Sequence, residues 1–287
     1  MKLSIIVPSY NQSHFIGRTL ESILSQNDPD CEIIIMDGGS TDDTMTIVER
    51  YRERLAIVVS EKDGGQSDAL QRGYLLSTGD YIGWQNSDDI YFPGAFASFR
   101  SAYDSDAKLN TVAHVYFGNQ CIIGPRDELL NGKIFGPFRL DYLLYAGWNI
   151  TNQSSFFSRQ AIERAGGFDA SLHYAMDLDL YIRLAKSNAK FKWINKYWGG
   201  FRIHDASKGS TLHRVRDKEY LDLRSRYLPE FNPIVSWDRQ FRLKRIYEWI
   251  IRYLDLLRMG LLHRRFIEKS NASNIEKRLK VEFSSSL

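Results

Sequence analysis

The first 90 residues alternate short apolar runs with amphipathic segments, and this order constrains the fold more than any other feature. Leu3 to Val7 is a continuous apolar run, as expected of a strand buried on both faces of a parallel sheet. Comparable runs follow at residues 31–36, 55–60 and 80–85, with helical patterns between them. Strands that alternate with helices favour right-handed parallel connections. The order therefore predicts an α/β fold with a mostly parallel, Rossmann-like sheet flanked by helices.

Beyond residue 93 the pattern is less regular. It predicts a helix at 96–102, a strand at 112–123, a loop at 132–136, a helix at 159–165 and a buried helix after residue 176.

Polar loops follow three of the expected strands, at residues 8–12, 37–43 and 86–89. The carboxyl ends of parallel strands meet at one edge of a sheet, where open α/β folds bind their ligands. The sequence therefore predicts a nucleotide-sized cleft at this edge. It lacks both the G-x-G-x-x-G fingerprint and the G-x-x-x-x-G-K-[ST] phosphate loop, so a nucleotide must be held in another way.

Composition sets broad limits on function. The 287 residues carry a net charge of only +3, which gives no reason to expect nucleic acid as a partner. The apolar run at the start is too short for a signal peptide, and no apolar stretch is long enough to span a membrane. We expect a cytoplasmic location.

Asn86-Ser87-Asp88-Asp89 places two adjacent carboxylates directly after a strand. Mg²⁺ and Mn²⁺ commonly bridge one or two protein carboxylates to substrate phosphates. The same residues are also common in turns and helix caps, so these residues alone leave both interpretations open.

Asp177 lies at or near the start of the helix expected after residue 176. A carboxylate there can cap the helix. It can equally act as a general base that faces the cleft.

Four segments, taken together and in this order, resemble the family 2 glycosyltransferases. They are Ser4-Ile-Ile-Val-Pro-Ser-Tyr-Asn11, Asp37-Gly-Gly-Ser-Thr-Asp-Asp-Thr44, Asn86-Ser-Asp-Asp89 and Met176-Asp-Leu-Asp-Leu-Tyr-Ile-Arg-Leu184. The resemblance covers roughly residues 3 to 210 and implies a GT-A fold.

The resemblance implies a nucleotide-diphospho-sugar donor, most often a UDP-sugar, and a Mn²⁺ or Mg²⁺ cofactor. The residues it assigns to the nucleotide are Pro8, Ser9, Tyr10, Asn11, Asp37, Gly64, Gln66, Asp68 and Asp88. It assigns the metal to Asp89, with His204 as a further contact to metal or phosphate. A surface position for His204 remains the alternative.

The resemblance also makes Asp177 the catalytic base of an inverting transfer. Met176 stands where the family has Glu, which leaves this assignment less secure. The Gln-x-x-Arg-Trp motif of processive synthases is missing after Asp177, so we expect transfer of a single sugar.

The acceptor side is expected around Trp148, Asn152 and Gln153, because rings and amides suit the two faces of a carbohydrate. Simple packing is the alternative role for Trp148. A saccharide or a polyprenyl-linked saccharide is the acceptor that the resemblance implies.

The C-terminal part has a different pattern. Residues 239–269 hold nine Lys or Arg against three Asp or Glu, and apolar residues recur at helical spacing: Leu243, Ile246, Ile250, Tyr253, Leu254, Leu257 and Leu261. A basic amphipathic helix is typical of a membrane-surface element at 237–269, here at the inner face of the membrane. Alternatively, the helix packs its apolar stripe on the catalytic domain.

These patterns predict a catalytic domain at residues 1–212 and a helical, basic extension at 213–287. The domain divides into a nucleotide-binding half, 1–95, and an acceptor and catalytic half, 96–212. The expected function is an inverting, metal-dependent glycosyltransferase of surface polysaccharide biosynthesis. A sugar-nucleotidyltransferase of the same broad fold and a non-catalytic nucleotide-sugar-binding module are the alternatives.

Overall fold

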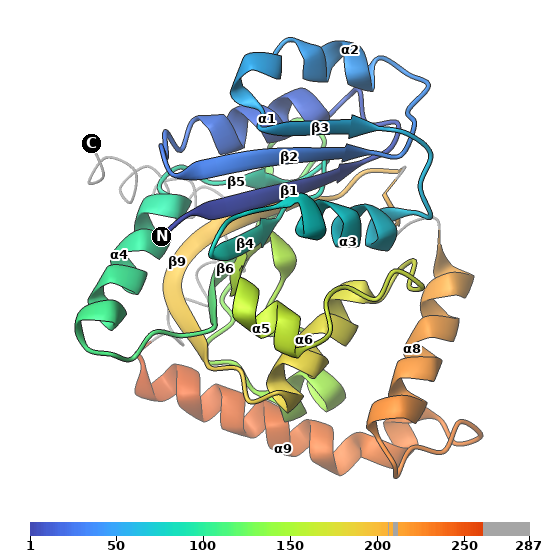
Figure 1. Cartoon of the computed structure of the whole chain (residues 1–287). Coiled ribbons are helices and arrows are strands. Elements are labelled where there is room, and N and C mark those ends of the chain that lie inside the picture. Colours follow the sequence, from blue (N-terminus) through green and yellow to red (C-terminus); the bar gives the residue numbers. More distant parts are fainter. Residues whose placement is uncertain (206, 209–211, 261–287) are drawn as a thin grey trace.

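The computed structural model describes residues 1–205, 207–208 and 212–260, which fold around one curved sheet (Figure 1). The first half supplies β1 (Leu3–Ser9), α1 (Ile16–Leu24), β2 (Cys31–Asp37), α2 (Thr44–Glu49), η1 (Arg52–Arg54), β3 (Ile57–Ser60), α3 (Gln66–Leu76) and β4 (Tyr81–Trp84). The four strands pair in parallel, and β1 is buried along its whole length. Its continuous apolar run is therefore explained by helices on both faces.

The second half extends the sheet with antiparallel and parallel strands. Its elements are β5 (Ile90–Tyr91), α4 (Ala95–Lys108), β6 (Val115–Ile123), β7 (Leu129–Lys133), η2 (Tyr142–Ala146), η3 (Asn152–Ser154), β8 (Ser155–Ser158), α5 (Arg159–Arg164), α6 (Met176–Lys186) and β9 (Phe191–Arg202). The strand order is β3-β2-β1-β4-β8-β6-β9-β5, and β7 pairs with β6. The predicted α/β class with flanking helices is confirmed. The loop expected at 132–136 is wrong in its first residues, because β7 pairs through Lys133 with β6.

Two apolar layers hold the helices to the sheet. On one face Ile6 packs with residues of α3, α5 and α6, among them Leu70, Ala161 and Leu180. On the other face Ile5 packs with α1, α2 and α4, through Leu20, Val48 and Phe99. Because successive side chains of β1 point to opposite faces of the sheet, this one strand packs against both helix layers.

Two further helices, α8 (His213–Tyr227) and α9 (Trp237–Arg258), pack on the second half (Figure 1). The buried face of α9 contains charged residues: Glu248 pairs with Arg139 through two 3.0 Å hydrogen bonds, and Arg252 donates to the carbonyl oxygens of Ile134 and Phe135.

The apolar stripe of α9 faces solvent, so the expected packing of this stripe on the catalytic domain is not what the structure has. Leu243 is 81% exposed, and Ile250 and Leu257 are each 52% exposed. Leu261, the last residue of the predicted stripe, lies outside the described residues. None of the described helices combines the length and apolar content needed to cross a membrane.

Candidate active site

The carboxyl ends of β1, β2 and β3 form one wall of the site, because Ser9, Asp37 and Ser60 are neighbours in the strand register. The Asp37 carboxylate is nearly buried and accepts hydrogen bonds from the backbone N–H of Ser40 at 2.9 Å and from the Ser60 hydroxyl at 2.7 Å. These bonds fix the carboxylate at the floor of the predicted nucleotide site.

The loop at residues 8–12 is joined to the loop at residues 37–43 by hydrogen bonds that fix its shape. Asn11 has a positive φ of 51°, its N–H donates to the Ser40 hydroxyl at 2.8 Å, and its side-chain oxygen accepts from the Thr41 N–H at 2.9 Å. The Tyr10 ring beside it is 59% exposed, as a stacking surface for a base requires. Pro8 and Ser9 are buried, so they shape the wall rather than face the cleft.

The loop before α3 adds acidic groups to this wall. Asp68 accepts the Gly64 N–H at 3.0 Å, which is a helix-start contact, and Asp63 accepts the Gly65 N–H at 2.8 Å. A Cβ on Gly38 would lie 3.1 Å from the Asp63 carboxylate, so only glycine fits there without displacing Asp63. Burial and then the nearby Asp68 carboxylate raise the pKa of Asp63. Asp63 was not among the residues predicted for the site.

Asp89 is fully buried and its carboxylate is occupied by the protein. One oxygen accepts from Asn86 at 2.9 Å and from Gln153 at 2.8 Å, and the other accepts the Arg202 N–H at 2.8 Å. Burial, followed by the neighbouring Asp88 carboxylate, raises its pKa well above the ordinary value. In this arrangement Asp89 holds the 86–89 loop to β9, and its oxygens do not face the cleft.

Asp88 is the carboxylate of this loop that reaches the cleft. Its Oδ2 lies 3.0 Å from Nε2 of His204, and the two side chains converge from β4 and from the segment after β9. The Phe15 ring lies between His204, with ring centroids 4.5 Å apart, and the Arg202 guanidinium, 5.1 Å from the ring centroid. His204 is thus packed into the site, which argues against the surface alternative.

No cluster of three or more His, Cys, Asp or Glu side chains suited to a metal occurs among the residues that the structure describes. Asp88 with His204 is a pair of donors. Such a pair fits a Mg²⁺ or Mn²⁺ ion that takes its remaining ligands from a diphosphate and water, as these ions commonly do.

Asp177 lies in the first turn of α6 and is not its cap. The capping function belongs to Glu219 of α8, whose buried carboxylate accepts the N–H groups of His173, Tyr174 and Ala175 at 2.7, 2.9 and 2.8 Å. Burial raises the pKa of Asp177 to about 6, against the opposing effects of the Leu178 N–H and of Lys208. A carboxyl with this pKa can accept a proton near neutral pH.

Lys208 connects the donor wall with Asp177. Its Nζ donates to Oε1 of Gln66 at 2.6 Å, and Nε2 of Gln66 donates to the Asn86 side chain at 2.6 Å. Loss of water around the ammonium lowers its pKa to about 8, although the carboxylates of Asp88, Glu219, Asp63 and Asp177 act in the opposite direction. Lys208 also donates to the carbonyl oxygen of His173 at 3.2 Å, so its ammonium joins the loop before α3 to the segment before α6.

The three expected acceptor residues separate in the structure. Trp148 is half-buried, and its ring packs edge-to-face on Tyr181 with centroids 6.5 Å apart. Asn152 and Gln153 are both buried, and Gln153 bonds to Asp89 and to Gln120. The Gln153 amide supports the 86–89 loop, whereas the buried Nδ2 of Asn152 has no hydrogen-bond partner among the described residues, and the acceptor role expected of both residues remains a prediction.

Two solved structures have a fold similar to that of this chain. The fold is similar to that of Staphylococcus aureus TarS in complex with UDP-GlcNAc, with a TM-score of 0.62, 18% identity, and coverage of 84% of this chain and 69% of that chain. It is also similar to the mannosyltransferase PcManGT from Pyrobaculum calidifontis in complex with GDP-Man and Mn²⁺, with a TM-score of 0.57, 19% identity, and coverage of 99% and 83%. The fold is therefore that of the GT-A glycosyltransferases.

The chain belongs to glycosyl transferase family 2, whose model matches residues 4–166. It is 33% identical over 196 residues to the chondroitin synthase of Escherichia coli, which covers 68% of this chain and 28% of that protein. This chain thus spans less than a third of the length of that relative.

Proposed function

We propose that the protein transfers a single sugar from a nucleotide-diphospho-sugar to a saccharide acceptor, with inversion at the anomeric carbon, in polysaccharide biosynthesis. The observation that carries this proposal is the position of Lys208, whose ammonium donates to Gln66 at 2.6 Å on the donor side and to the carbonyl oxygen of His173, just before α6, at 3.2 Å. Donor-binding groups and a candidate base thus face one cleft.

The donor wall fits a nucleotide held by its base and ribose. The exposed Tyr10 ring offers a stacking face, and the partly exposed Asp63 and Asp68 offer carboxylate acceptors to N–H and O–H groups, while the buried Asp37 holds the wall behind them. A UDP-sugar is our first choice of donor. TarS with UDP-GlcNAc and PcManGT with GDP-Man support a nucleotide-diphospho-sugar of either base.

Asp88 and His204 are the residues we propose for a divalent cation, in place of the Asp89 assignment, because Asp89 is buried and fully hydrogen-bonded. The Mn²⁺ in the PcManGT complex supports a cation at this kind of site. When bound, such a cation neutralises negative charge that develops on the departing diphosphate. Lys208 adds a positive charge on the same side.

Asp177 is the proposed base. Its carboxylate takes the proton of the acceptor hydroxyl as the oxygen of that hydroxyl attacks the anomeric carbon, and the bond to the diphosphate breaks. The nucleoside diphosphate leaves with the bonding electron pair, and no covalent enzyme intermediate forms. Attack from the side opposite the leaving group inverts the configuration.

Asp177→Asn tests this assignment. The amide keeps the shape of the side chain but cannot accept the proton, so transfer falls by at least about 100-fold, the lower end of the usual contribution of a general base. Binding of the nucleotide, measured by calorimetry, stays within a factor of about two. Asp222→Asn, an exposed position on α8, is the matched control. Near-normal transfer by Asp177→Asn would remove the residue from the mechanism.

The exposed face of α9 supports a second proposal, peripheral contact with a membrane at its inner face. Its apolar stripe combines aliphatic residues with Trp249, Tyr247 and Tyr253, and Arg239, Arg242 and Arg258 are exposed beside it. Interfacial helices use this combination to bury an apolar face and attract anionic lipids. A lipid-linked saccharide as acceptor would be consistent with this location.

A further inference from the structure

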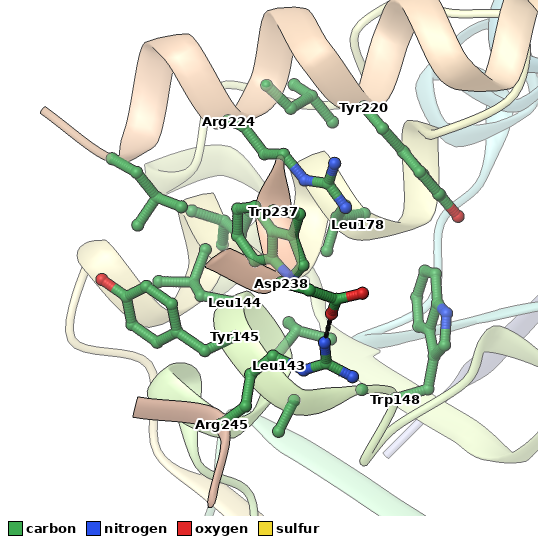
Figure 2. A pocket seen from close by; sticks show the side chains of 15 residues that line it. Leu143, Leu144, Tyr145, Trp148, Leu178, Tyr220, Arg224, Trp237, Asp238 and Arg245 are labelled. Carbon is green, nitrogen blue, oxygen red and sulfur yellow. Dashed lines mark ion pairs between the residues drawn. The ribbon is translucent and has the colours of Figure 1, made fainter. Parts of the chain in front are cut away.

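A cavity of about 320 Å³ opens beside the start of α6, between η2, α6, α8 and the first turns of α9 (Figure 2). Its volume lies at the lower end of the range of small-ligand sites. Most of its lining is aliphatic or aromatic, and two arginines interrupt it. The residues used below are Trp148, Leu178, Ile182, Tyr220, Arg224 and Trp237.

The wall that α6 contributes to this cavity begins one residue after the proposed base. Leu178 directly follows Asp177, and Ile182 continues the wall one helical turn further along α6. Tyr220 faces them from α8, and burial followed by the charge of Asp177 raises the pKa of its phenol. The cavity therefore extends away from the base along α6.

Arg224 presents a cation inside this cavity. Its guanidinium carbon lies 4.0 Å from the centroid of the Trp237 ring and 5.9 Å from that of Tyr220, and Figure 2 shows the group between these rings. In the part of the chain that the structure describes, Arg224 has no hydrogen bond or ion pair with a carboxylate. Arg245, on the opposite wall, is paired with Asp238.

A half-buried cation without a carboxylate has lost part of its hydration without a compensating charge. Burial accordingly lowers the pKa of Arg224. The guanidinium has five N–H donors in a planar fork that matches a carboxylate or a phosphate. An anionic ligand group would compensate the Arg224 guanidinium for the hydration that it loses on burial.

Because α8 is a helix, Arg224 lies about 6 Å beyond Tyr220 along the helix axis. A ligand that reaches both the base and Arg224 needs a polar hydroxyl at one end, a ring or rings against Trp148 and Tyr220, and an anion at the other end. A saccharide with an acidic substituent has this form.

We propose that the cavity is an acceptor subsite for an acidic saccharide, whose carboxylate or phosphate binds Arg224 while its reactive hydroxyl lies at Asp177. The proposal rests on the transferase function above and narrows the class of acceptor. A uronate and a sugar phosphate share the required chemistry and differ only in the source of the anion.

Binding of three probes to the full chain, saturated with UDP and Mn²⁺, tests the proposal. The probes are a disaccharide ending in a uronic acid, the same disaccharide with its carboxyl reduced to an alcohol, and a disaccharide phosphate. Titration by NMR or calorimetry is expected to show at least one acidic probe binding about tenfold or more tightly than the reduced probe, as the loss of a charge-assisted bond predicts. The tighter acidic probe identifies the source of the anion.

Arg224→Gln is expected to remove the preference for the acidic probe. Arg214→Gln, at an exposed arginine ten residues earlier on α8, is expected to keep it. UDP affinity stays unchanged in both variants. Equal binding of acidic and reduced probes by the unmodified protein, or no binding of any acidic probe, overturns the proposal even if Arg224→Gln fails to fold. So does a preserved preference in Arg224→Gln. Failure of UDP itself to bind would instead count against the proposed function.

Discussion

At the scale of single residues, the two adjacent aspartates of the 86–89 loop have different environments and therefore different expected functions. Asp89 is enclosed by three N–H donors, from Asn86, Gln153 and Arg202, whereas Asp88 meets His204 at the cleft. Both are carboxylates on one short loop, and only their hydrogen-bond partners separate them.

Substitution separates the two functions. Asp88→Asn is expected to weaken the dependence of nucleotide binding on Mn²⁺ by at least about tenfold, because a charged ligand becomes neutral, while the unfolding midpoint changes little. Asp89→Ala leaves buried donors without an acceptor and lowers the unfolding free energy by about 1–3 kcal/mol. Calorimetry with Mn²⁺ or chelator, paired with urea unfolding, checks both. A stable Asp89→Ala protein that has lost only its response to Mn²⁺ would restore Asp89 as the metal ligand.

The pH dependence follows from Asp177 and Lys208. The pKa of Asp177 is raised to about 6, so its base form is lost as pH falls through 6. The pKa of Lys208 is lowered to about 8, so its charge is lost as pH rises through 8. We expect kcat/KM, which reports the free enzyme, to be bell-shaped with limbs near these values. Lys208→Arg should move only the alkaline limb upward, and a flat profile between pH 5 and 9 would contradict both assignments.

At the scale of elements, α8 positions the start of α6 through a single buried side chain. Glu219 accepts three consecutive N–H groups, those of residues 173–175, just before the helix that carries Asp177. Both α8 and α6 lie outside the family match at 4–166, so the position of the proposed base depends on elements beyond that match. The boundary predicted at residue 212 remains a prediction, and α8 does not behave as a detached appendage.

Glu219→Gln tests this function of α8. The amide replaces one accepting oxygen by an NH2 donor, which then faces backbone N–H donors. We therefore expect a loss of about 1.5–3 kcal/mol of unfolding free energy. We also expect a drop in kcat larger than any change in nucleotide affinity. Lys218→Gln, its exposed neighbour, serves as the control. Unchanged kcat in a folded Glu219→Gln protein would mean that the contact is structural only.

The elements that could be predicted from the sequence are those with a single strong period. β1 and β2 are continuous apolar runs, and α1 has its apolar residues on one face, so all three were predicted nearly to their bounds. β9 was not, because Lys192, Asn195 and Lys196 interrupt its aromatic residues. Its course depends on a tertiary approach: a Cβ on Gly199 would lie 2.0 Å from the carbonyl oxygen of Gln153.

The candidate site was predictable in the same uneven way. Asp37, Asp88 and Asp177 stand at the ends of elements, where sequence order alone indicates a ligand edge. Arg202, Lys208 and Glu219 bond to partners far along the chain, and no local pattern marks such pairs. The burial of Gln153 and Asn152 was likewise invisible, because amides have no periodic signal of burial.

At the scale of the whole molecule, α9 places its apolar stripe outward and its charged residues Glu248 and Arg252 inward. Phe241 and Leu256 are buried on the same inward face, and the outward stripe is an exposed apolar face larger than single surface residues would produce. The proposed membrane contact accounts for both the stripe and the arginines beside it.

Replacing Leu243, Ile250 and Leu257 together by serine is expected to reduce sedimentation with phosphatidylglycerol vesicles by at least about tenfold, since each side chain contributes apolar burial of about 1.5 kcal/mol or more. Activity on a soluble acceptor should not change, because these side chains face away from the cleft. High salt should weaken binding of the unmodified protein in part. Equal sedimentation of the two proteins would reject the contact.

The central claim is that the cleft binds a nucleoside diphosphate through a divalent cation. Calorimetric titration of the purified protein with UDP, GDP and CDP, each with Mn²⁺ and with chelator, tests it most directly. We predict that one nucleotide, UDP in the first instance, binds with Mn²⁺ and loses most of its affinity with chelator. If no nucleotide binds under either condition, the proposed transferase function is contradicted.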